Sequence, residues 1–134
     1  GVSEGDHVYV LGFPMSLVGQ GDRRNSVLVR HGTIARLRDT LEGHSPSFLV
    51  DTFVFPGNSG GPVILEPEAF AIEGTKKVEA ALLVGMVAAN IFYKDTAVST
   101  QTNRPRIIFE DNAGLGVVYP VDYIEECIAL SAQT

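Results

Sequence analysis

The chain has 134 residues and a formal net charge of −6, with 45% hydrophobic and 19% charged residues. This length predicts a single domain over residues 1–134, and the composition excludes a disordered or fibrous chain. An acidic surface repels phosphate backbones, so nucleic acid is not expected as a partner.

Short segments rich in branched and aromatic residues predict β-strands. The expected strands cover residues 7–13, 26–37, 47–52, 62–65, 78–90 and 114–119. Within the second, Gly32 is expected to allow a bulge and a bend. Residues 78–90 also have the Ala and Leu content of a helix, but Gly85 and the neighbouring valines favour a strand. The polar segments 15–25, 38–46 and 66–77 are expected to connect strands, and residues 92–112 to form a long irregular loop.

The end of the sequence predicts a helix. Asp122 and Glu125 have the spacing of a capping box. The apolar face of this helix is formed by Val121, Ile124 and Ile128, with Cys127 at its edge and expected to pack into the core. Six strands and a closing helix predict an all-β fold, a six-stranded antiparallel barrel of the Greek-key type.

The densest group of unusual residues is Gly57-Asn58-Ser59-Gly60-Gly61-Pro62. The nucleophile elbow of α/β-hydrolases has a similar G-x-S-x-G pattern, but it needs a helix after the serine, and Gly60, Gly61 and Pro62 prevent one. Two interpretations remain open from the pattern alone. Ser59 is a nucleophile whose loop amides bind an oxyanion, or Ser59 belongs to a glycine-rich turn and bonds only to the backbone.

The same six residues resemble the active-serine loop of the chymotrypsin-fold serine peptidases. Residues 51–52, 85–89 and 116–119 follow in the order of the second barrel of that family. Residues 7–14 and 32–35 resemble two earlier strands in HtrA-type and related trypsin-like peptidases. The resemblance covers nearly the whole chain and implies the C-terminal barrel of a trypsin-like serine peptidase.

The resemblance also implies roles for residues of the loop. Ser59 would be the catalytic nucleophile, and Gly57, Asn58 and Ser59 would form the oxyanion hole. Asn58 stands where digestive and clotting enzymes carry an aspartate that pairs with a newly cut N-terminus. Because Asn58 has no charge for that pairing, the chain is closer to the HtrA-like type.

The catalytic histidine and aspartate of the family lie in its first barrel, whereas this chain matches only the second. His7, His31 and His44 do not stand in the motif that supplies the base, and surface or strand-end positions are expected for them. A serine without a base is a weak nucleophile. The chain alone is therefore expected to be inactive, with the missing N-terminal barrel as a partner.

Substrate contacts follow from the same resemblance. The residues expected to bind a polypeptide substrate are Phe53, Val87, Ala88, Ala89 and Gly116. Peptidases that cleave after Lys or Arg have an acid at the position of Phe53, so a small apolar side chain is expected instead. Residues 87–89 would pair with an extended substrate by strand addition, although they also suit an ordinary core strand.

A second class of function is also possible. The chain is then a non-catalytic barrel that binds peptides or acts as a scaffold, and Ser59 has no catalytic role. A lone second barrel would expose the apolar face that packs on its mate, and self-association is expected.

The sequence gives little support for a metal, cofactor or membrane site, and it does not define the cellular compartment. No cluster has the spacing of a metal site, and no phosphate-binding loop precedes a helix, so neither a metal nor a cofactor is expected. No apolar run approaches the roughly 18 residues that span a bilayer, residues 1–6 lack a secretion signal, and no membrane partner is expected. The single cysteine excludes an internal disulfide, which is compatible with a reducing compartment but does not define the localisation.

Overall fold

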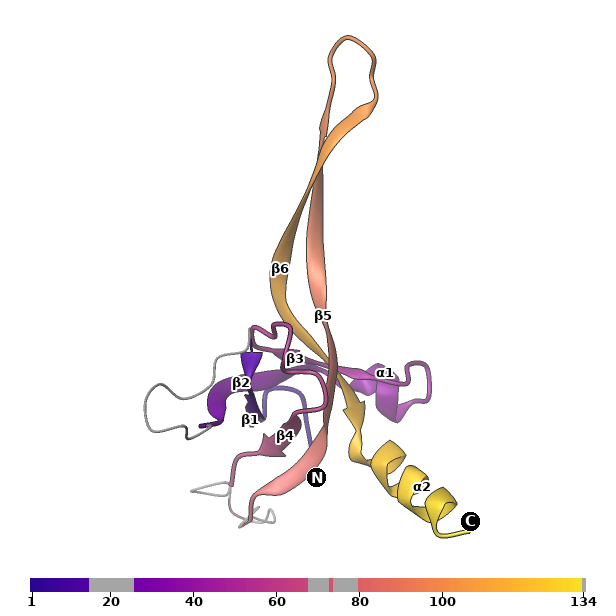
Figure 1. The fold of residues 1–134 in the computed structure, drawn as a ribbon. Helices are drawn as coiled ribbons and strands as arrows, with labels where there is room; N and C mark the ends of the chain where they lie inside the picture. The colour runs from indigo at the N-terminus through magenta and orange to yellow at the C-terminus, as the bar shows by residue number, and fades with distance from the viewer. Residues whose placement is uncertain (15–25, 68–72, 74–79, 134) are drawn as a thin grey trace.

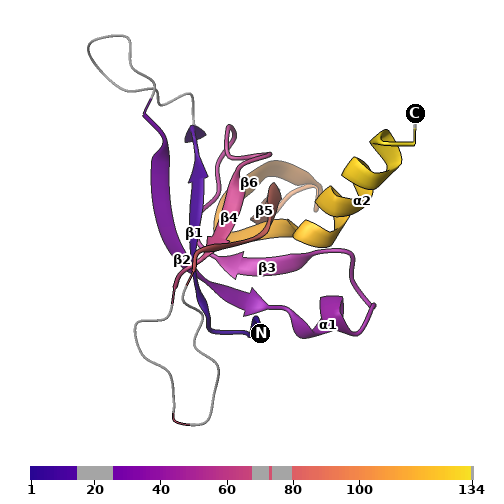
Figure 2. The same ribbon diagram turned by 90° about the horizontal axis from the view of Figure 1, so that it is seen from below.

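Six strands close into an antiparallel barrel in the order β1-β2-β3-β6-β5-β4 (Figures 1 and 2). The computed structural model describes residues 1–14, 26–67, 73 and 80–133. The strands are β1 His7–Gly12, β2 Leu28–Arg36, β3 Phe48–Asp51, β4 Pro62–Leu65, β5 Leu82–Val98 and β6 Pro105–Pro120, and the helices are α1 Arg38–Leu41 and α2 Val121–Ser131. The expected fold class, a six-stranded antiparallel barrel with a C-terminal helix, is confirmed. The expected connection over residues 15–25 lies outside the described residues, as does most of that over 66–77.

Alternation along the strands separates the inside of the barrel from its outer face. In β1, Val8 and Val10 are fully buried while His7 is exposed and Tyr9 is half-buried. The core is built mainly of valines, and the interior of a small barrel is filled by its side chains. Its buried members are Val8, Val10, Ile34, Leu37, Phe48, Val50, Val54, Val63, Leu65, Val84, Val87 and Val118.

Pairing between β1 and β4 closes the barrel. Val8 is opposite Leu65 and Val10 is opposite Val63. Strand β1 also pairs with β2, so the spatial order β4-β1-β2-β3 is a Greek key. This closure brings the end of β1 next to the segment that precedes β4.

The expectation of a β-bulge at Gly32 is wrong. Gly32 pairs regularly with Val8, and the irregularity between β2 and β3 lies between Ile34 and Arg36. Glycine is needed at position 32 for another reason, because a Cβ atom there would lie 2.6 Å from the carbonyl oxygen of Asp51. Gly32 therefore allows two strands to approach closely.

Strands β5 and β6 continue beyond the barrel as a two-stranded ribbon (Figure 1). The irregular loop expected over residues 92–112 is wrong, since Phe92 to Ala97 pair with residues 107–112. Lys94 and Glu110 face each other across the ribbon at 3.1 Å, and the Ser99 amide donates to the Arg104 carbonyl oxygen at 3.0 Å to close the turn. The polar residues of this segment suggest a loop. Cross-strand pairing nevertheless supplies hydrogen-bond partners for its backbone groups, although the ribbon lies outside the barrel core.

The helices differ from expectation in their ends and packing. Segment 38–46 contains the short helix α1, which lies on the same side of the barrel as α2 (Figures 1 and 2). The expected capping box is wrong, because Pro120 is the N-cap of α2 and no side chain caps it. Cys127 is exposed, and α2 buries no residue, so the expected packing of Cys127 is also wrong. None of the described helices has the length and apolar character to cross a membrane.

Glu4 fixes the start of α1 from a distant part of the chain. Its Oε1 atom accepts hydrogen bonds from the amides of Leu37 at 3.0 Å and Arg38 at 3.1 Å. These bonds stabilise the carboxylate, and the bond from Leu37 contributes most to holding the pKa of Glu4 below its usual value. The carboxylate therefore acts as the acceptor that the helix start lacks locally.

We expect Glu4→Gln to reduce the pH dependence of stability. A lowered carboxyl pKa adds stability above the pKa of the unfolded chain, and this is lost as the pH falls through the folded pKa. Wild type is thus expected to be more stable than Glu4→Gln near neutral pH, and the difference in the free energy of unfolding is expected to shrink in acid. Urea unfolding at a series of pH values measures this difference. A difference that stays constant with pH would contradict the role of the Glu4 carboxylate.

Candidate functional site

The loop between β3 and β4 is held by Asn58, which is only 1% exposed. The Asn58 Oδ1 atom accepts a hydrogen bond from the Phe55 amide at 3.2 Å, and the Asn58 amide donates to the Phe55 carbonyl oxygen at 3.0 Å. The Gly61 amide donates to the Asn58 carbonyl oxygen at 2.9 Å. Asn58 is therefore an uncharged internal brace for the turn that carries Ser59.

Glycine is required at two positions of this loop, because each lies against a backbone carbonyl oxygen. Gly57 has φ +100°, and a Cβ atom there would overlap the carbonyl oxygen of Phe13. At Gly61, a Cβ atom would overlap the carbonyl oxygen of Leu11. The end of β1 and the loop therefore touch backbone to backbone, at a separation that no side chain permits.

The loop amides divide into bonded and free groups. The amides of Asn58 and Gly61 bond within the loop, and the Gly60 amide donates to the Val87 carbonyl oxygen at 2.8 Å. Within the described part of the chain, the amides of Gly57 and Ser59 donate to no acceptor. These two free amides are the donors expected for an oxyanion hole, and they stand on either side of the buried Asn58.

Ser59 is exposed, and its hydroxyl donates to the carbonyl oxygen of Ala88 at 3.4 Å, which is a long and therefore weak hydrogen bond. A cleft of about 330 Å³ lies beside it, with Gly57, Ser59, Gly60, Gly61 and Pro62 on one wall and the end of β1, with Val27, on the other. The serine is accessible to a partner molecule.

No histidine in the described structure bonds to Ser59. His31 Nε2 lies 2.9 Å from Glu66 Oε2, and His44 Nε2 lies 3.6 Å from Glu42 Oε2. His7 stacks on His31 with ring centroids 5.0 Å apart. All three sit at the surface or strand-end positions expected for them, being exposed.

Strand β5 passes directly beside the loop. The Val87 amide donates to the Gly61 carbonyl oxygen at 2.9 Å, and the Val87 side chain is 1% exposed. Ala88 is the extra residue of a bulge, because Val87 pairs with Val118 and Ala89 pairs with Val117. After Val87, the strand pairing of β5 in the described structure is with β6 alone. Its other edge has no strand partner there, although the Ala88 carbonyl oxygen accepts the Ser59 hydroxyl.

Gly116 packs closely against the buried Val54, whereas Phe53 is exposed. Val54 is 2% exposed, and a Cβ atom on Gly116 would lie 2.7 Å from its Cγ2 atom. Phe53 is 49% exposed and its ring stacks on Phe55 at 6.2 Å. The space next to Gly116 is thus occupied by Val54, whose carbonyl oxygen accepts a hydrogen bond from Asn112 at 2.7 Å.

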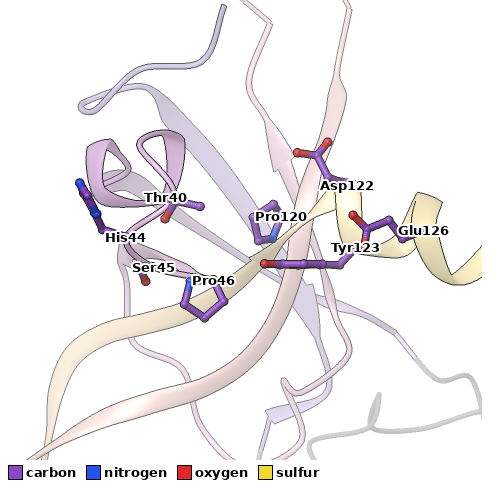
Figure 3. Close-up of a pocket in the computed structure, with 9 residues that line it drawn as sticks. Thr40, His44, Ser45, Pro46, Pro120, Asp122, Tyr123 and Glu126 are labelled. Atoms are coloured by element: carbon purple, nitrogen blue, oxygen red, sulfur yellow. The ribbon is translucent and has the colours of Figure 1, made fainter.

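A second cleft, of about 380 Å³, separates the α1–β3 connection from the start of α2 (Figure 3). His44 lies on the α1 side, and Asp122 and Glu126 lie on the α2 side (Figure 3). It shares no residue with the Ser59 loop. Two hydroxyls that line this second cleft, of Thr40 and Ser45, donate to the Ser47 carbonyl oxygen at 2.7 and 2.8 Å.

The fold brings together one group that spacing along the sequence did not reveal. His7, His31 and Glu66 come from three different segments, yet their ligand atoms all lie within 4.8 Å of one another. The hydrogen bond with His31 contributes most to holding the pKa of Glu66 below its usual value. The hydrogen bond from Tyr9 to this carboxylate raises the pKa of the Tyr9 phenol. The alternation that turns His7 and Tyr9 outward on β1 is the sequence signal that points to such a surface group.

Comparison with protein families, characterised proteins and solved structures gives no match. The structure alone establishes the six-stranded barrel with its C-terminal helix, and these comparisons assign it to no family.

We expect Gly57→Ala to destabilise the fold more than Gly60→Ala. Both residues have positive φ, which costs an alanine roughly 1–2 kcal/mol. A Cβ atom at Gly60 meets nothing within 4 Å, whereas one at Gly57 overlaps the Phe13 carbonyl oxygen. The expected loss for Gly57→Ala is about 2–5 kcal/mol, because displacement of packed backbone adds to the conformational cost. Urea unfolding of both variants measures the difference, and equal losses would show that the loop does not rest on β1.

Proposed function

We propose that this chain is the nucleophile-bearing barrel of a trypsin-like serine peptidase, which hydrolyses peptide bonds in the intact protein. The observation that carries the proposal is the pair of free amides, of Gly57 and Ser59, beside an exposed serine hydroxyl. Amides of this kind stabilise the negative oxygen that develops when a carbonyl group is attacked. The buried Asn58 keeps them in place without a charge.

In the proposed reaction, Ser59 Oγ attacks the carbonyl carbon of the scissile bond, and the Gly57 and Ser59 amides bind the resulting oxyanion. A histidine accepts the serine proton and passes it to the leaving amine. Water then hydrolyses the acyl-enzyme and restores the hydroxyl. Because no described histidine bonds to Ser59, the histidine and its orienting acid would come from a first barrel outside the printed chain.

The free edge of β5 is suited to an extended polypeptide substrate. Its backbone groups from Ala88 onward face no other described strand, and a peptide can add there as a further strand. Val54 fills the space beside Gly116, which favours a small apolar side chain in the primary pocket. A large or charged side chain would have to displace a buried valine.

A second candidate function is a peptide-binding barrel in which Ser59 is idle. It is favoured by the bond of the Ser59 hydroxyl to the Ala88 carbonyl oxygen and by the lack of a base among the described histidines. The same β5 edge would bind the peptide in both cases.

The decisive experiment uses the full-length protein, with fluorophosphonate labelling and turnover of a peptide library. A peptidase is expected to be labelled at Ser59, and Ser59→Ala is expected to lose labelling and turnover while peptide binding is retained. Ser99→Ala, at the tip of the β5–β6 ribbon, is the matched control and is expected to behave as wild type. Equal peptide binding by wild type and Ser59→Ala, without labelling or turnover in either, would overturn the peptidase proposal and favour the binding barrel.

We expect the chain alone to show no peptide turnover. We also expect it to self-associate. Large apolar side chains are exposed on the ribbon and on α2, where Ile108 is 61% exposed and Leu130 is 65% exposed. Exposed apolar surface of this kind favours association. Sedimentation velocity over a range of concentrations is expected to show a dimer or larger species, and a monomer at every concentration would contradict the expectation.

A further inference from the structure

Two histidines and a glutamate gather on the outer face of the barrel, where β2, β1 and β4 are neighbours. His7 begins β1, His31 lies within β2, and Glu66 directly follows β4. Their ligand atoms lie within 4.8 Å of one another, and His31 Nε2 is 2.9 Å from Glu66 Oε2. This group is separate from the Ser59 loop, whose residues it does not include.

Strand register fixes the backbone of all three residues. Val8 pairs with Leu65, and the Glu66 amide continues this ladder by donating to the His7 carbonyl oxygen at 2.9 Å. His31 is paired with Tyr9. Because paired residues of antiparallel strands point to the same face, His7, Tyr9, His31 and Glu66 share the outer face of the barrel.

Neighbouring rings restrict the side chains as well. The His7 and His31 rings are stacked, with an interplanar angle of 19°, and the Tyr9 ring centroid lies 5.3 Å from that of His31. The Tyr9 hydroxyl donates to Glu66 Oε1 at 3.2 Å, while Oε2 faces His31. One carboxylate oxygen is therefore held by a partner, and the other is directed towards the imidazole.

We infer that His7, His31 and Glu66 form a binding site for a divalent transition metal ion, with Zn²⁺ as the ion whose chemistry they suit best. Two imidazole nitrogens and a carboxylate oxygen are a ligand set that Zn²⁺ takes in proteins, with water in a fourth position. Zinc ligands at about 2.0–2.2 Å stand roughly 3.3 Å apart in a tetrahedron. The His7 and His31 rings are stacked, so zinc binding requires one ring to turn out of the stack until a nitrogen of each points at the same ion. Zn²⁺ then replaces the contact between His31 and Glu66.

The Tyr9 hydroxyl has a supporting role in this site. A carboxylate ligand that is hydrogen-bonded by a second residue is oriented before the metal arrives. Tyr9 holds Oε1 in this way, so that Oε2 is the oxygen offered to the metal. The metal would link β2, β1 and the end of β4 across the outside of the barrel.

Calorimetric titration of the chain with ZnCl₂ tests the proposal. All proteins in the test carry Cys127→Ser, because the exposed Cys127 thiol is itself a zinc ligand. We expect one Zn²⁺ per chain, with the affinity reduced at least tenfold by His7→Ala, by His31→Ala and by Glu66→Gln. His44→Ala is the matched control, since it removes an exposed histidine that faces one carboxylate without a third ligand, and it is expected to bind as wild type does.

A second measurement does not depend on the variants. Addition of Zn²⁺ to the chain with its three histidines is expected to shift the ring NMR signals of His7 and His31 and to leave those of His44 unchanged. The proposal is overturned if the chain binds no Zn²⁺, or if all three ligand variants bind it as tightly as wild type. It is also overturned if the His44 signals shift and those of His7 and His31 do not, since binding would then be elsewhere.

Discussion

Contact between two backbones is the constraint on which the candidate site depends. Closure of the barrel through β1 and β4 sets the end of β1 against the loop that carries Ser59. Only glycine fits at positions 57 and 61, where a Cβ atom would overlap the carbonyl oxygens of Phe13, directly after β1, and of Leu11 within it. The loop is therefore shaped from outside by the barrel and from inside by Asn58. A side chain at either glycine would alter the site and the closure of the barrel together.

Local sequence patterns predicted most of the barrel, because branched residues and turn residues mark its strands. Each of the six strands and the closing helix overlaps the segment expected for it, but β5 and β6 extend far beyond theirs. The ribbon of β5 and β6 was missed because its many polar residues imitate a loop, while its stability comes from pairing with a distant segment. The His7, His31 and Glu66 group was missed for a related reason, since only the register of three strands brings these residues together. The packing of Val54 against Gly116 likewise depends on a tertiary contact that no local pattern contains.

The Ser59 loop and the histidine group occupy opposite ends of the same pair of strands. Strand β1 runs from His7 to Gly12, which touches Asn58, and β4 runs back from Pro62 to Leu65. At about 3.3 Å per residue, the two ends of β1 are roughly 17 Å apart. The proposed nucleophile therefore needs a base from elsewhere, because His7 and His31 are held at the other end and His44 faces Glu42 beside α1. The partner of His31 is Glu66 and not the serine.

The β5–β6 ribbon also bears on the order in which the barrel folds. Its two strands are joined by the short connection 99–104, and closing a short loop loses little chain entropy. Hairpins of this kind form on a scale of roughly 1–10 μs, so pairing can begin at the turn and extend towards Val87 and Val118. The contacts of β1 with β4 join segments far apart in sequence, from Val8 to Leu65, and we expect them to form later. The free amides beside Ser59 would then take their positions only in the last step of folding.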